Sequence, residues 1–91
     1  MGVRTIRESH RASAALDAGR KKYARLDEAW TGISWFLARA PMDGPEVFAG
    51  VFMLKFASYI ELEIAVPSIT ILYTYSEQFV DVISVKFSDE D

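Results

Sequence analysis

Three side chains in this sequence suggest acid–base or phosphoryl chemistry, and they lie far apart. His10 is the only histidine of the 91 residues. It stands between a presumed strand and a helix, where it could act as a general base, although a polar surface or capping role is the simpler interpretation. Lys55 and Lys86 are the only basic residues after residue 39, and a lysine can stabilise charge that develops on a phosphoryl group. His10, Lys55 and Lys86 are therefore the candidate catalytic residues.

The residue types present exclude several other kinds of site. The sequence contains no cysteine, which rules out a disulfide framework, a thiolate zinc site and a cysteine nucleophile. No glycine-rich phosphate loop or paired-histidine motif can be identified. Glu61 and Glu63 share one face of a predicted strand, where two carboxylates could bind a metal. Simple alternation explains them as the solvent side of that strand, so we expect no metal and no cofactor.

Charge is distributed unevenly along the chain, whose formal net charge is −3. Residues 1–39 hold eight basic and four acidic residues, a net +4, whereas residues 40–91 hold two basic and nine acidic residues, a net −7. A basic half and an acidic half suggest either that the two halves attract each other within the molecule or that the protein presents a charged surface to a partner. The excess of acid argues against nucleic acid as the main partner, so we expect purified protein to leave RNA intact.

Four basic residues within six positions form a basic cluster, which is a candidate partner-binding site. The simpler alternative is a solvated helix end, where positive charge complements the helix dipole. The members of this basic cluster are Arg20, Lys21, Lys22 and Arg25.

The first forty residues predict a short strand and two helices. Residues 2–8 form the strand, and Ser9 suits the N-cap of an alanine-rich helix over residues 11–22. Asp27 is predicted to cap a second helix, with Leu26 just before the cap, and Pro41 is predicted to stop it after Arg39.

The second helix carries two tryptophans with different expected roles. Trp30, Ile33 and Leu37 recur at spacings of three and four, which predicts that they face the core. Trp35 lies off this apolar stripe, so it is predicted to contact a partner or the back of the sheet.

From residue 47 onward the hydrophobic period becomes two, as in strands with one buried face. Residues 59–66 alternate without interruption and predict a single strand, and residues 69–75 predict a central strand whose inner face packs under the second helix. Residues 76–78 predict a hairpin loop. In the last strand, residues 79–87, the parity slips between Val82 and Ile83, which indicates either a bulge or a strand covered on both sides.

Helical periods therefore come first and strand periods follow, which predicts an α+β fold. It consists of a short N-terminal strand, two helices and an antiparallel sheet of three to four strands. We expect one domain over residues 1–91, with the strand and helices in 1–40, the sheet in 46–87 and an acidic tail in 88–91. No apolar run approaches the roughly 18 residues of a membrane span, and no signal peptide is recognisable, so we expect a cytoplasmic protein without membrane contact.

The helical segment resembles that of the compact RelE/ParE-type toxins. In residues 23–30 and 35–41, a helix rich in Trp and Leu ends in Leu-Ala-Arg and a proline before the sheet. Residues 67–75 and 80–85 resemble the two central strands of that superfamily, and the order of elements agrees as well. The resemblance implies a toxin of a type II toxin–antitoxin module, neutralised by an antitoxin.

The same resemblance bears on which activity to expect. In members that cleave messenger RNA on the ribosome, basic residues on the sheet and a tyrosine near the C-terminus do the work. Lys55 and Lys86 match two basic positions by rough location, whereas the flanking arginines and the terminal tyrosine have no counterpart. We therefore expect binding rather than catalysis, in the manner of relatives that poison DNA gyrase or of a non-toxic relative. The alternative is a non-enzymatic interaction module that pairs with itself as a homodimer.

Overall fold

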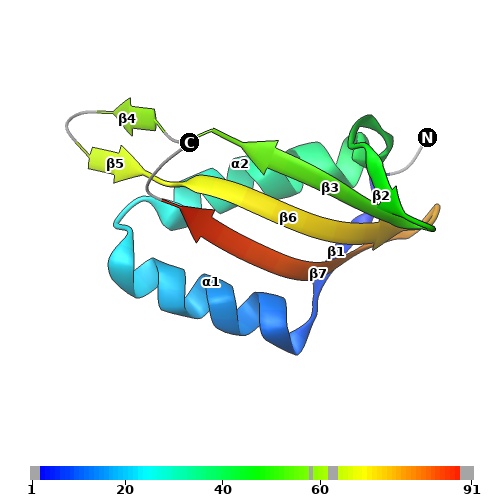
Figure 1. Ribbon diagram of the computed structural model, residues 1–91, viewed down its shortest axis with the longest axis horizontal. Coiled ribbons are helices and arrows are strands. Elements are labelled where there is room, and N and C mark those ends of the chain that lie inside the picture. Colours follow the sequence, from blue (N-terminus) through cyan, green and yellow to red (C-terminus); the bar gives the residue numbers. More distant parts are fainter. Residues whose placement is uncertain (1–2, 58, 62–63, 89–91) are drawn as a thin grey trace.

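The computed structural model describes residues 3–57, 59–61 and 64–88. A five-stranded sheet is packed against two helices, with α2 behind the sheet and α1 alongside β7, and a separate two-stranded hairpin completes the fold (Figure 1). This arrangement confirms the α+β class. The elements are β1 (Thr5–Glu8), α1 (His10–Lys22), α2 (Leu26–Arg39), the 3-10 helix η1 (Pro41–Asp43), β2 (Glu46–Phe48), β3 (Val51–Phe56), β4 (Tyr59–Glu61), β5 (Ile64–Val66), β6 (Ser68–Tyr75) and β7 (Phe79–Ser88).

The main sheet differs from the prediction in strand number and in one pairing. Its order is β1-β7-β6-β3-β2, so it has five strands rather than three to four. The pairs from β2 to β7 are antiparallel as expected, but β1 pairs with β7 in parallel and makes the sheet mixed. Arg7 and Asp81 face each other across this pair and form a bidentate ion pair at 2.6 and 3.0 Å. Such a pairing between the two ends of the chain leaves no trace in local periodicity.

The first helix begins where β1 leaves the edge of β7. Ser9 caps it as predicted, because its hydroxyl accepts a hydrogen bond from the Ala12 amide at 3.0 Å. The same hydroxyl donates to the carbonyl of Ile83 at 2.8 Å, and the Ser9 amide donates to the carbonyl of Val82. The helix start is thereby tied to β7.

Ile83 is the extra residue of a β-bulge, which decides between the two alternatives for the last strand. Leu72 pairs with Ser84, but Tyr73 pairs with Val82, so Ile83 has no partner on β6. The shift returns Val85 to the same buried face as Val82 and leaves Ile83 exposed.

The second helix starts differently from the prediction. It begins at Leu26, and its N-cap Arg25 makes no side-chain capping bond, so the assignment of Asp27 as the cap was wrong. The Asp27 carboxylate instead accepts a hydrogen bond from Arg20 at 2.5 Å. Leu26 is buried inside the first turn rather than before it. The Asp27 carboxylate thus forms an ion pair with an arginine of α1 in place of a capping hydrogen bond at the start of α2. The helix ends at Arg39, before Pro41, as expected.

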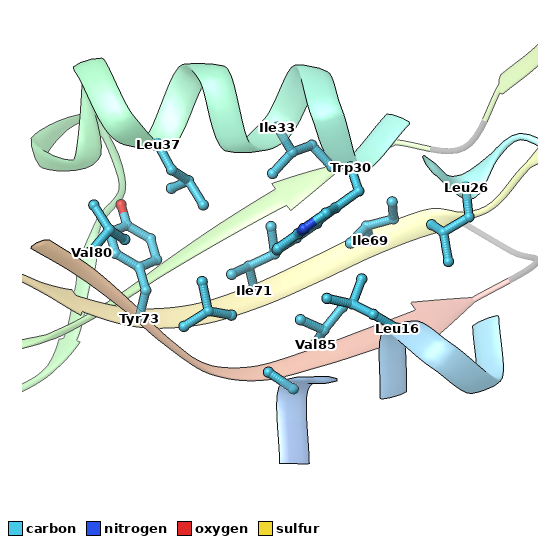
Figure 2. Close-up of a cluster of buried hydrophobic side chains, with 12 residues drawn as sticks. Leu16, Leu26, Trp30, Ile33, Leu37, Ile69, Ile71, Tyr73, Val80 and Val85 are labelled. Carbon is cyan, nitrogen blue, oxygen red and sulfur yellow. The ribbon is translucent and has the colours of Figure 1, made fainter. Parts of the chain in front are cut away.

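The core lies between the helices and the inner face of β6 and β7 (Figure 2). Trp30, Ile33 and Leu37 of α2 are buried there, as the spacing predicted. They share one cluster with the inner-face residues of β6, which are Ile69, Ile71 and Tyr73. The indole N–H of Trp30 donates to the Glu8 carboxylate at 3.2 Å, which satisfies its one polar atom.

Residues 59–61 and 64–66 form two paired strands rather than parts of one continuous strand. Strands β4 and β5 pair antiparallel, with Tyr59 opposite Val66 and Glu61 opposite Ile64. Alternation is the same whether a strand continues or turns back, so the pattern alone did not separate these cases. The paired-carboxylate site falls outside the description, because Glu63 is not among the described residues.

Within the described residues, neither helix is long and apolar enough to cross a membrane.

Tyr73 makes folding sensitive to alkaline pH. Its ring is fully buried, its hydroxyl donates to the Pro41 carbonyl, and burial raises the pKa of the phenol above its usual value. Above about pH 10 the unfolded chain loses this proton while the folded chain keeps it, so the free energy of unfolding falls as pH rises. We expect the stability advantage of the wild type over Tyr73→Phe to shrink between pH 9 and pH 12 in urea titrations. Parallel pH profiles for the two proteins would contradict this expectation.

Candidate functional site

The structure aligns two of the three candidate catalytic residues and leaves the third apart. Lys55 of β3 pairs with Thr70 of β6, and Thr70 pairs with Lys86 of β7. The two lysine Cα atoms therefore lie about 10 Å apart in one cross-strand row. His10 follows Ser9, which is bonded at Val82 and Ile83, about 10 Å before Lys86 along β7. The histidine thus stands outside the row of lysines.

The lysine row lies on the face of the sheet opposite the core. Phe52, Leu54 and Phe56 pack toward the core, so Met53 and Lys55 point to the other side. Lys55 and Lys86 are both exposed there. We call this side the open face, because no described helix or strand covers it; Figure 1 looks onto it, with α2 behind the sheet.

The ion pair between Arg7 and Asp81 also lies on the open face, away from the row of lysines. Hydrogen bonding from Arg7 lowers the pKa of the Asp81 carboxyl below its usual value. The Arg7 guanidinium also lies over the Phe79 ring, 3.8 Å from the centroid. Arg7 and Asp81 thus neutralise each other, whereas Lys55 and Lys86 face no carboxylate on the described residues of the strands around them.

Trp35 is exposed on α2, on the side away from the core. Its side chain is 60% exposed, as expected for a residue off the apolar stripe. The Arg39 guanidinium lies 4.1 Å from the ring centroid, and its Nη1 donates to the Trp35 carbonyl at 3.0 Å. These two contacts hold the arginine over one face of the indole.

Arg20 and Arg25 of the basic cluster form ion pairs within the molecule, and Lys21 is exposed on α1. Arg20 donates to Asp17 at 2.7 Å and to Asp27 at 2.5 Å, which links α1 to α2 and raises the pKa of the guanidinium. Arg25 pairs with Glu28, and the Lys22 amine lies 5.2 Å from the Tyr23 ring centroid. The cluster therefore contributes to the junction between the two helices.

An apolar groove of about 270 Å³ lies between α2 and the ends of β3 and β6. Sequence analysis missed it, because its walls come from three separate segments. Gly32 was the one available signal, since a glycine in mid-helix leaves space beside the helix. The apolar lining residues are Ala29, Gly32, Ile33, Phe56, Ala57, Pro67 and Ile69.

Other exposed apolar side chains come from the segment between α2 and β3. Met42 of η1 is 50% exposed, and Phe48 of the edge strand β2 is 71% exposed. The described parts of the chain contain six large exposed apolar residues. Four of them, Met42 and Phe48 together with Trp35 and Val47, lie within residues 35–48. No group of three His, Asp or Glu residues in those parts is arranged to hold a metal ion.

Comparisons with known proteins return no match: no family model, no curated protein and no solved structure is similar to this chain.

Proposed function

We propose that this protein acts by binding another protein through Trp35, as a RelE/ParE-like toxin-type protein or a non-toxic relative of one. The observation that carries the proposal is the exposed Trp35 ring with Arg39 held over it. Trp and Arg are the residues most enriched among those that dominate binding energies at protein interfaces. An indole already fixed by a neighbouring guanidinium loses little conformational entropy on binding.

The toxin-type form of the proposal draws on the resemblance of residues 23–30 and 35–41 and on the order of elements. In this form Trp35 contacts a protein target in the cell, and an antitoxin neutralises the protein. Such a mechanism needs no base or nucleophile in the chain, and it is compatible with the separation of His10 from the lysine row.

A second candidate function is a homo-oligomeric interaction module without toxicity. The edge strand β2 favours it, because all three of its residues are exposed and Phe48 is the most exposed large apolar side chain in the described residues. Charge and proline on an edge strand oppose pairing with another chain. The Glu46 carboxylate of β2 accepts a hydrogen bond from the Gly50 amide, so the contact in this alternative is made by the exposed Val47 and Phe48.

The decisive experiment is induced expression of the wild type, Trp35→Ala and Ile83→Ala in a bacterial host. Ile83 is the control, since it is also an exposed apolar residue but lies at the bulge of β7 in the sheet rather than on α2. We expect growth arrest with the wild type and Ile83→Ala, and normal growth with Trp35→Ala at the same protein level.

Arrest by Trp35→Ala would contradict the assignment of this surface. Normal growth with the wild type, together with a homodimer measured by light scattering, would transfer the proposal to the interaction module. In that case Phe48→Ser is expected to shift the protein toward monomer.

A further inference from the structure

The open face combines two lysines with half-buried aliphatic side chains. Met53 of β3 pairs with Leu72 of β6, one row away from the Lys55–Thr70–Lys86 row on the same face. Both aliphatic side chains are partly exposed. Successive rows on one face of a sheet lie about 6.8 Å apart. A ligand that covers one row therefore also contacts the other.

The charge of this face is opposite to that of the whole chain. Of the described residues of β1, β3, β6 and β7 on this side, only Asp81 is acidic, and Arg7 binds it. Among the described residues of these four strands on this side, Lys55 and Lys86 thus leave a net charge of about +2, in a chain of net charge −3. Charge complementarity favours an acidic occupant.

The residue types on the open face argue against single-stranded nucleic acid. Proteins that bind it combine a strongly basic groove with aromatic side chains on which bases stack. On β1, β3, β6 and β7 the one aromatic ring on this side is Phe79, and the Arg7 guanidinium already lies 3.8 Å from its centroid. Phe48 of the edge strand β2 pairs with Val51, four residues before Lys55 along β3, so it is not beside the lysine row. The row beside the lysines is aliphatic instead.

The charge of the open face also argues against a second copy of this chain as its binding partner. Two copies related by a twofold axis present the same patch to each other. Face-to-face packing would bring the lysines of one copy close to those of the other, which is repulsive. The occupant is therefore a segment of a different protein.

We propose that the open face binds an acidic, amphipathic segment of a partner protein, with its carboxylates on Lys55 and Lys86 and its apolar side chains on Met53 and Leu72. A helix that crosses the strands matches this pattern. Residues i and i+7 on one helix stripe lie about 10.5 Å apart, close to the spacing of about 10 Å between the two lysine Cα atoms. This surface is separate from Trp35, so the proposal stands or falls independently of the proposed function.

The test is selection of peptides from a random 16-residue phage-displayed library on the immobilised full-length protein. Enriched sequences are expected to carry at least two Asp or Glu residues together with several Leu, Ile, Val or Met. The synthetic form of the most enriched peptide is then titrated by fluorescence anisotropy. We expect the Lys55→Gln, Lys86→Gln double variant to bind it at least tenfold more weakly, and binding to weaken as salt is raised.

A control variant, Arg11→Gln, removes an exposed positive charge from α1 instead. It is expected to bind the peptide as the wild type does, and so is Trp35→Ala. Thermal unfolding of every variant verifies that each is folded. Leu72→Thr keeps a strand-forming residue and is expected to weaken binding without loss of the fold.

Four results would overturn the proposal. They are no enriched peptide, enriched peptides without acidic residues, unchanged affinity in the Lys55/Lys86 double variant, and tighter binding of a 12-nucleotide single-stranded RNA that depends on the same two lysines. The last result would assign the open face to nucleic acid.

Discussion

Trp30→Ala is expected to lower the free energy of unfolding by about 3–5 kcal/mol, as for other truncations of buried aromatic residues. Trp30 is only 7% exposed and packs in the core cluster between α2 and the inner face of the sheet. Its removal also leaves the Glu8 carboxylate without the indole N–H that it accepts at 3.2 Å. Since small domains are stable by about 5–15 kcal/mol, we expect poor expression or a melting temperature near ambient.

Trp35→Ala is the matched control, because it removes the same side chain from the same helix at an exposed position. Because the Trp35 side chain is 60% exposed and its ring lies against the exposed Arg39, the substitution is expected to lower stability by less than about 1 kcal/mol. Thermal unfolding followed by circular dichroism measures both variants. Equal melting temperatures for Trp30→Ala and the wild type would show that the buried face of α2 was assigned wrongly.

Gly44→Ala is expected to destabilise the protein by about 1–3 kcal/mol or more, although its backbone conformation suits any residue. Gly44 follows η1 with φ of −79°. A Cβ atom there would approach the Tyr73 hydroxyl and lie 2.9 Å from the Met53 carbonyl oxygen and 3.0 Å from Leu54 Cγ. Because Tyr73 is fully buried and bonded to Pro41, it has no room to move aside.

Gly32→Ala is expected to change stability in the opposite direction from Gly44→Ala. A Cβ at Gly32 meets no atom within 4 Å, and the residue lies inside α2. Alanine is the better helix former by about 0.5–1 kcal/mol, so this variant is expected to be more stable than the wild type. Urea unfolding of both variants tests the pair, and a Gly44→Ala protein as stable as the wild type would contradict the close approach.

The two proposals describe separate surfaces that serve a binding protein in different ways. Trp35 and Arg39 lie on α2, in the helical layer, whereas Lys55 and Lys86 lie on the open face of the sheet. Partners at these two surfaces would lie on opposite sides of the sheet. A variant that removes one function and keeps the other would establish that the surfaces act separately.

The sequence by itself determined the local elements and most of their buried faces. Ser9 predicted the start of α1, Pro41 the end of α2, and the spacing of Trp30, Ile33 and Leu37 its buried stripe. The parity slip after Val82 indicated either a bulge or a strand covered on both sides, and the register of β6 and β7 decided for the bulge at Ile83. These features were predictable because capping, helical spacing and strand alternation depend on residues a few positions apart. The same helical geometry placed Trp35 off the buried stripe but left open whether its ring contacts a partner or the back of the sheet, and the structure leaves the ring exposed.

Only the tertiary structure decided how distant segments combine. Local patterns do not relate residues that are far apart in the sequence. Strand β1 pairs in parallel with β7, and Lys55 and Lys86 align across Thr70. In addition, the Asp27 carboxylate accepts a hydrogen bond from Arg20. The groove beside Gly32 likewise needs walls from three segments. Alternation shows which side of a strand each residue faces, but the register between strands is set by packing of the whole core. That register places the two lysines in one row and leaves His10 outside it.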